Sequence, residues 1–161
     1  MITQERLKEL LHYDTETGIF TWVSVKGNMK PGMIAGRTNA DGYIVIKIDS
    51  IPYMAHRLAW LYCHGSMPTN FIDHINSIKN DNRKINLREA TKQQNNHNKI
   101  RPNKDNTSGY LGVSYHKVMR KFAANITKNN RMIHLGYFDD PAIAHQAYLK
   151  AKRELHEYCT I

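Results

Sequence analysis

The sequence is poor in several features that mark particular classes of protein. It has two cysteines in 161 residues, Cys63 and Cys159, and neither belongs to a CxxC pair. A cysteine-rich zinc site is therefore excluded, and a disulfide is not expected. No apolar run approaches the roughly 18 residues that a membrane-spanning helix needs. The N-terminus is polar and lacks the apolar core of a secretion signal, so we expect a cytoplasmic protein without membrane association.

Acidic residues are almost missing from one quarter of the chain. The formal net charge is +9, and the stretch from Lys92 to His134 holds nine basic residues and a single acid, Asp105. Positive charge concentrated in this way is typical of a surface that binds phosphate groups, which points to nucleic acid as the partner. The alternative is a solvated surface with a chance basic bias.

The first half of the chain alternates short helical patterns with short strand-like ones. Thr3 can cap a helix over residues 3–11, and Gly65 is a natural end for a second helix that starts at His56. Residues 26–41 are rich in glycine and polar side chains and are predicted to form a loop. Strands are predicted over residues 19–23, 42–48, 52–55, 71–75 and 85–87.

The second half has a different order of predicted elements. Residues 96–107 are polar and contain a proline, which predicts a linker. Three strand-like runs follow over residues 110–115, 121–127 and 131–138, with Asn129-Asn130 as a hairpin turn. Asp140-Pro141 is typical of a helix start, and the helix places these residues on one face: Ile143, Ala144, Ala147, Tyr148, Ala151 and Leu155. The predicted fold class is α+β, ending in a three-stranded antiparallel sheet packed on one helix.

The polar segment between Asp73 and Asn95 carries residues suited to phosphodiester hydrolysis. That reaction needs a base for water, and a histidine that titrates near neutral pH, such as His74, can serve as the base. It also needs positive charge beside the phosphate, which one Mg²⁺ or Mn²⁺ can supply, with Asp73 and Asn95 as oxygen ligands. Asp73 and His74 are neighbours on one strand and point to opposite faces. Asn86 is placed to hold the His74 ring in one orientation and tautomer.

With this order of residues, the segment resembles the HNH endonuclease family, and most closely the phage and intron-associated homing endonucleases. The motifs that carry the resemblance are His56-Arg57-Leu58-Ala59-Trp60, Asp73-His74, Asn82-Arg83, Asn86-Leu87-Arg88-Glu89-Ala90-Thr91 and Gln94-Asn95. The resemblance implies a ββα-metal fold and products with 5′-phosphate and 3′-hydroxyl ends. It implies that His74 is the general base, that Asp73 and Asn95 are metal ligands, and that Asn86 orients His74. The family often has a histidine where this chain has Asn95, and the zinc-binding CxxC pairs of some relatives are missing, so no zinc is expected.

Each of these roles has a structural alternative. A buried Asn86 can simply bond backbone groups, and Asn96 and Asn98 are near rivals of Asn95 as a ligand. For His56 we expect a place at the start of a helix or in the core, and a phosphate contact is the alternative. Two further residues are expected in the core: Trp22 and Trp60.

Residues of about 108–156 resemble the plant apetala-two/ethylene-response DNA-binding domain. The resemblance is carried by residues 108–115, 121–126, 134–138 and 142–151. It implies that the three-stranded sheet lies in the major groove of DNA, with the helix behind it. From the residues themselves, we expect these side chains to contact phosphates: Lys117, Arg120, Lys121, Lys128 and Arg131. We expect the side chains of His116, Asn125 and Thr127 to contact base edges. The alternative is that this polar sheet face is only solvated and does not bind DNA.

Together these features predict a metal-dependent HNH endonuclease of two domains that acts on double-stranded DNA. The nuclease domain is expected over residues 1–95, a linker over 96–107 and the DNA-binding domain over 108–157. One site per chain predicts nicking by a monomer. Two alternatives remain: a DNA-binding or transcription-regulatory module with an inactive nuclease remnant, and a non-specific defence or packaging nuclease.

Overall fold

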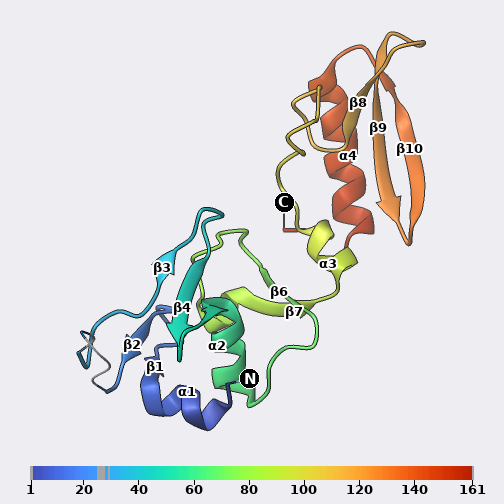
Figure 1. Cartoon of the computed structure of the whole chain (residues 1–161). Coiled ribbons are helices and arrows are strands. Elements are labelled where there is room, and N and C mark those ends of the chain that lie inside the picture. Colours follow the sequence, from blue (N-terminus) through green and yellow to red (C-terminus); the bar gives the residue numbers. More distant parts are fainter. Residues whose placement is uncertain (1, 25–27, 29, 161) are drawn as a thin grey trace. The chain divides into compact units, whose positions relative to one another are not determined.

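The computed structural model describes residues 2–24, 28 and 30–160 of the chain (Figure 1). These residues form two compact units, Met1–Thr91 and Lys92–Ile161, and both mix helices with antiparallel strands. The predicted mixture of helices and strands is therefore confirmed. Among the described residues, no helix has the length and apolar character needed to span a membrane.

The first unit contains small antiparallel sheets gathered around two helices (Figure 1). Its elements in chain order are α1 (Gln4–Leu10), β1 (Leu11–Tyr13), β2 (Phe20–Trp22), β3 (Arg37–Thr38), β4 (Ile44–Ile48), β5 (Ile51–Met54), α2 (Ala55–His64), β6 (Phe71–His74), the 3-10 turn η1 (Lys84–Asn86) and β7 (Leu87–Ala90). The sheets are β1-β2, β3-β4-β5 and β6-β7.

The core of the first unit joins the leading hairpin to α2. Leu7 and Leu11 are fully buried with Leu58 from α2 and Ile46 from β4. Trp22 is buried in this core as predicted, whereas Trp60 is half-buried and stacks on the ring of His64. The leading elements are therefore part of the same folded body as β6 and β7, rather than an appendage.

Local sequence signals place the helix ends correctly. The Thr3 side chain accepts a hydrogen bond from the backbone N–H of Arg6, which caps α1. Gly65 ends α2 with a φ of 81°, a left-handed conformation that suits glycine.

One strand prediction and one loop prediction in the first unit need correction. The predicted strand over residues 85–87 begins only at Leu87, because Lys84–Asn86 form a 3-10 turn closed by a bond from the Asn86 N–H to the carbonyl of Arg83. In the range predicted as loop, Arg37–Thr38 pair with β4 as a short edge strand.

The second unit is a three-stranded sheet with a long helix along one face (Figure 1). Its elements are α3 (Lys92–His97), β8 (Val113–His116), β9 (Lys121–Lys128), β10 (Arg131–Phe138) and α4 (Pro141–Leu155). The predicted hairpin at Asn129-Asn130 is confirmed, since both residues have a positive φ. Asp140 caps α4 through bonds from the N–H groups of Ala142 and Ile143.

The buried face of α4 is narrower than predicted. Ala144, Tyr148 and Ala151 are buried against the sheet, at the spacing of one helix face. Ile143 belongs to the face predicted from the helical spacing, but it is 58% exposed. It precedes Ala144 by one position, and this rotates its side chain by about 100° away from the buried stripe.

The two units divide after Thr91, four residues before the boundary expected after Asn95. Several contacts within the second unit hold the segment that follows α3. The ring of His97 stacks on that of His156 at 3.9 Å, and the Lys152 ammonium donates to the carbonyl of Lys99. In the range expected as a linker, the Asn106 side chain donates hydrogen bonds to the backbone carbonyls of Tyr110 and Val113. These bonds give this polar stretch a defined path.

Candidate functional site

The β6-β7 hairpin places Asp73 and His74 side by side at the end of β6. In the ladder, Asp73 pairs with Arg88 and His74 pairs with Leu87. Asp73 and His74 are each only 5% exposed. Asp73 and His74, which are expected to carry the chemistry, are therefore adjacent and both buried in the first unit.

Asp73 forms a charged pair with its cross-strand neighbour. The Nε and Nη2 atoms of Arg88 both donate to Oδ2 of Asp73, at 2.9 and 2.8 Å. An ionised carboxylate is costly to bury alone, and this pair offsets much of that cost while fixing the side chain. Arg88 thereby holds the Asp73 carboxylate in a fixed place beside His74.

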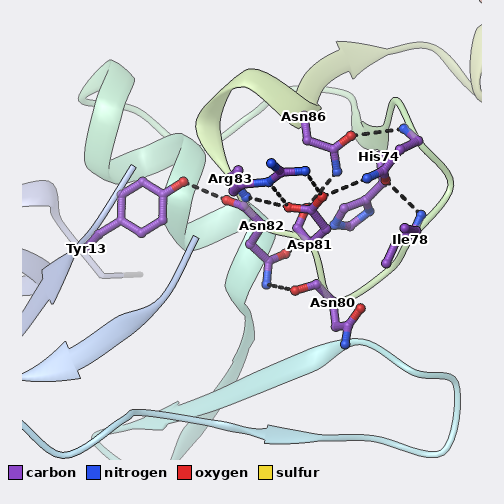
Figure 2. Close-up of polar contacts among 9 residues, drawn as sticks. Tyr13, His74, Ile78, Asn80, Asp81, Asn82, Arg83 and Asn86 are labelled. Atoms are coloured by element: carbon purple, nitrogen blue, oxygen red, sulfur yellow. Dashed lines mark hydrogen bonds and ion pairs between the residues drawn. The ribbon is translucent and has the colours of Figure 1, made fainter. Parts of the chain in front are cut away.

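The ring of His74 is bonded by Asn82. Nε2 of His74 lies 3.1 Å from Oδ1 of Asn82, which is an acceptor, so Nε2 carries the ring proton (Figure 2). The neutral ring then has its basic lone pair on Nδ1. Burial lowers the pKa of His74 below its usual value, while the bond to Asn82 and the carboxylates of Asp73 and Asp81 oppose that shift. The ring is thus kept neutral and able to accept a proton.

The loop that carries Asn82 is closed by side-chain bonds (Figure 2). Asn86 accepts from the backbone N–H of Asn76 at 2.9 Å and donates to the carbonyl of Asp81 at 2.7 Å. Arg83 bonds both oxygens of Asp81, at 2.7 and 2.6 Å, and these bonds lower the pKa of Asp81 to about 2. Asn86 therefore connects the start of the loop to its end. The side chain that bonds the His74 ring is that of Asn82.

Sequence reasoning assigned no role to Asn82. It lies within the motif Asn82-Arg83, and its 2% exposure is unusual for an asparagine in a polar loop. The sequence signal that could have identified it is the density of asparagines in the loop, but four of them compete there: Asn76, Asn80, Asn82 and Asn86. Only the folded path of the loop distinguishes them.

The leading hairpin supports the same loop. Tyr13 of β1 donates its hydroxyl to the carbonyl of Asn82 at 2.6 Å (Figure 2). The N–H of Lys84 donates to the carbonyl of Thr15 at 3.1 Å, in the turn between β1 and β2. Gly18 in that turn lies so close that an added Cβ would be 2.5 Å from the backbone nitrogen of Arg83. The small leading sheet therefore positions the loop that bonds His74.

His56 lies in the first turn of α2 and is buried, as expected for a residue at a helix start. Its ring contacts that of His74 edge to face, with 5.1 Å between the ring centroids. Burial, and secondarily the nearby His74 and Arg57, lower the pKa of His56 to about 3. His56 is therefore an uncharged neighbour of His74.

The metal ligands can be placed only in part. Asp73 is in the first unit, whereas Asn95 lies on α3 in the second unit, so their pairing stays a prediction. Where the structure describes the chain, no three His, Cys, Asp or Glu side chains form a group that could hold a metal ion. Magnesium does not require such a group, since it usually takes one or two protein oxygens with water and phosphate. The Asp73 carboxylate is a donor that suits such a hard cation.

The predicted DNA-contacting cations lie at the two ends of the second unit's sheet. Lys117 and Arg120 are exposed in the turn between β8 and β9, and Lys128 and Arg131 are exposed on either side of the Asn129-Asn130 turn. Lys121 forms an ion pair with Asp139 at 3.2 Å. The residues on β9 between these ends span about 23 Å at the usual strand rise.

The sheet face that points away from α4 carries the predicted base-contacting residues. Ala124 and Ile126 are buried on the helix side, so Asn125 and Thr127 alternate to the other side. On that outer face Asn125 lies opposite His134, whose Nδ1 is 3.0 Å from Oδ1 of Asn125. Tyr137 also lies there and was missed by sequence reasoning; its ring contacts those of His116 and His134 at 5.3 and 4.5 Å.

Residues 53–97 match the family model described as HNH endonuclease. This range contains His56, Asp73, His74, Asn82 and Asn95, and it covers over a quarter of the chain. Comparisons with curated proteins and with solved structures gave no match. The HNH part of the predicted resemblance is supported, because residues 53–97 are similar to the HNH endonuclease family.

Proposed function

We propose that the chain is a metal-dependent DNA endonuclease of the homing HNH type, with His74 as the general base. The observation that carries the proposal is the buried His74, with Nε2 bound to Asn82 beside the Asp73–Arg88 pair, inside the segment that matches the HNH family. A neutral histidine with one nitrogen fixed by an acceptor presents the other nitrogen as a base.

The proposed reaction begins with the loss of a proton from water to Nδ1 of His74, as the water oxygen attacks the phosphorus atom. Asn82 holds Nε2 throughout, so the ring keeps its orientation while it becomes an imidazolium. The carboxylates of Asp73 and Asp81 favour that charged form. The bond to the 3′-oxygen breaks, the leaving oxygen takes a proton from solvent, and the His74 imidazolium returns its proton to solvent. The products have 5′-phosphate and 3′-hydroxyl ends.

The donor set of Asp73 with Asn95 fits a single Mg²⁺ or Mn²⁺. When bound, the ion supplies positive charge for the phosphoryl oxygens and for the leaving 3′-oxygen. The chain itself supplies the base and its support: Arg88 fixes the Asp73 carboxylate, and Asn86 closes the loop that presents Asn82.

We further propose that the second unit holds double-stranded DNA and selects the site of cleavage. Cations at both ends of the sheet would contact phosphates: Lys117, Arg120, Lys121, Lys128 and Arg131. The polar outer face between them carries His116, Asn125 and Thr127 for base edges. Such binding should weaken steeply with salt, at a log–log slope of about −0.9 for each phosphate contact.

The test of the nuclease assignment uses supercoiled plasmid or phage DNA with Mg²⁺ or Mn²⁺, beside EDTA and a His74→Ala variant. Cleavage should require the metal and should fall by about 10²–10⁴ in His74→Ala, while DNA binding is retained. His12→Ala is the matched control, because His12 lies exposed on β1 of the same unit. Wild-type cutting by His74→Ala would remove His74 from the role of base.

The second candidate is a DNA-binding module with an inactive nuclease remnant. The basic second unit is compatible with that function, but Asp73, His74 and Asn95 are all present, and a remnant would be expected to lose at least one of them. Binding without any cutting, with either metal and over a genome-wide pool of sites, would favour this candidate.

A further inference from the structure

Three rings from separate elements form a cluster around the proposed base. Tyr43 directly precedes β4, His56 is in the first turn of α2, and His74 ends β6. The ring centroids lie 5.1 Å apart for His56 and His74, 5.3 Å for Tyr43 and His56, and 5.9 Å for Tyr43 and His74. Each ring of this aromatic trio therefore contacts the other two.

The position of His56 is fixed by the helix that carries it. The neighbouring residues Ala55 and Leu58 are buried in the core of the first unit, so the first turn of α2 cannot shift independently. Arg57 in the same turn donates to the carbonyls of Pro68 and Asn70, at 3.1 and 3.2 Å, just before β6. One helical turn therefore holds the chain where it enters β6 and, through His56, contacts the residue that ends β6.

The ring contact with His56 restrains His74 in a way that a hydrogen bond to one ring atom does not. The bond from Nε2 to Asn82 fixes the position of that nitrogen, whereas a contact between rings bears on the ring plane. The His56 ring lies at 80° to the His74 ring, and Tyr43 contacts both, so these contacts restrict the plane of the His74 ring. A general base must lie within hydrogen-bond reach of its water, and small misplacements cost much of the rate.

The nitrogen Nδ1 of His56 is buried and has no hydrogen-bond partner among the described residues. An unpaired buried nitrogen does not stabilise the fold, whereas the ring of the same side chain contacts His74 edge to face. Burial also keeps this ring neutral, and a neutral neighbour does not oppose the positive charge that His74 acquires.

We infer that His56 is a positioning residue, whose ring packs edge to face on His74 and fixes the plane in which His74 meets its water. This inference rests on the proposed role of His74 as the base. It predicts that the cleavage rate depends on a flat ring at position 56 and does not depend on the nitrogen atoms of that ring. His56→Phe keeps the ring without the nitrogens, and His56→Ala removes both.

Cleavage kinetics on a single-site DNA test the two variants. His56→Ala should lower kcat roughly 10–100-fold with KM unchanged, and His56→Phe should stay within about 3-fold of the wild type. His64→Ala, at the far end of the same helix, is the control for general effects on α2. If His56→Ala does not fold, His56→Leu fills the space without a flat ring and takes its place in the comparison.

A spectroscopic readout separates positioning from loss of stability. In ¹⁵N-histidine spectra of the full chain, His74 should show one neutral tautomer with the proton on Nε2 in the wild type and in His56→Phe. In His56→Ala the tautomer should stay the same, because Asn82 still accepts from Nε2, but the His74 ring signals should broaden as the ring plane becomes less restricted. Wild-type cutting by His56→Ala, or equal loss in the Ala and Phe variants, would overturn the inference. If the wild type itself cuts no DNA, the proposed function fails, while the spectra still test whether His56 positions His74.

Discussion

At the scale of single residues, the identity of the side chain that bonds His74 is the main result. Sequence reasoning gave this task to Asn86, whereas the structure places the amide of Asn82 against the ring and uses Asn86 to close the loop. The two residues are four positions apart, and both are buried asparagines. Composition alone could not separate them, because the difference lies in the path of the backbone.

Asn82→Ala should therefore impair the site directly. The substitution removes the acceptor for Nε2 of His74 and leaves a buried N–H unpaired, which should cost about 1–3 kcal/mol of stability. Loss of an orienting partner should lower the cleavage rate roughly 10–100-fold. Plasmid cleavage and thermal unfolding measure the two effects.

Asn80→Ala is the matched control for that experiment. Asn80 is in the same loop but exposed, and it accepts a bond from Asn82 through its backbone carbonyl, which alanine retains. It should cut and unfold like the wild type. Equal cutting by Asn82→Ala and Asn80→Ala would show that the bond to Asn82 does not support the base.

At the scale of elements, the hairpin β1-β2 acts as a support for the loop between β6 and β7. Their contacts join residues about seventy positions apart: Tyr13 to the carbonyl of Asn82, and Lys84 to the carbonyl of Thr15. The turn between the strands must approach the loop backbone closely. Gly18 permits this approach because it has no side chain and adopts a φ of 73°.

Gly18→Ala should disturb the candidate site from a distance. Its Cβ would lie 2.5 Å from the nitrogen of Arg83 and 2.6 Å from the carbonyl carbon of Asn82, and backbone atoms cannot move aside cheaply. The left-handed φ alone costs about 1–2 kcal/mol, and the collision should add to it. Urea unfolding should show the larger loss, and cleavage should fall with it.

Gly32→Ala isolates the two contributions. Gly32 has a φ of 82°, and no atom of the described residues lies within 4 Å of an added Cβ, so it carries the conformational cost without the collision. It should lose about 1–2 kcal/mol and keep its cleavage rate. If both variants lose the same stability and both keep full activity, the contact between Gly18 and the loop is unimportant.

The elements that could be predicted from sequence are those decided by neighbouring residues. The cap at Thr3, the turn at Asn129-Asn130 and the start at Asp140-Pro141 each depend on side chains within a few positions, and all three are confirmed. Ile85 misled the strand prediction because an apolar residue reads as buried, yet it is 83% exposed at the 3-10 turn. The aromatic trio depends on contacts between distant segments, which periodicity does not report.

At the scale of the whole molecule, the two units can be observed separately. Both tryptophans of the chain, Trp22 and Trp60, belong to the first unit, so tryptophan fluorescence reports the unfolding of the unit that contains His74. The second unit has a histidine with a lowered pKa of its own, His97, which burial and the nearby His156 keep uncharged. A probe confined to the first unit avoids this contribution.

The stability of the first unit should fall as the pH is lowered from about 7 to about 5. Unfolded histidines titrate near 6.5, whereas burial lowers the folded pKa of His56 to about 3 and also lowers that of His74. The unfolded chain therefore binds more protons below pH 6.5, and each such histidine can remove up to about 1.4 kcal/mol per pH unit. Asp81, with a folded pKa of about 2, loses its contribution only in more acidic solution. Urea unfolding followed by tryptophan fluorescence should give a lower midpoint at each step toward acid, and His56→Phe should reduce that dependence, because one of the two titrating rings is gone. Midpoints that do not change with pH would mean that both rings remain accessible to protons in the folded unit.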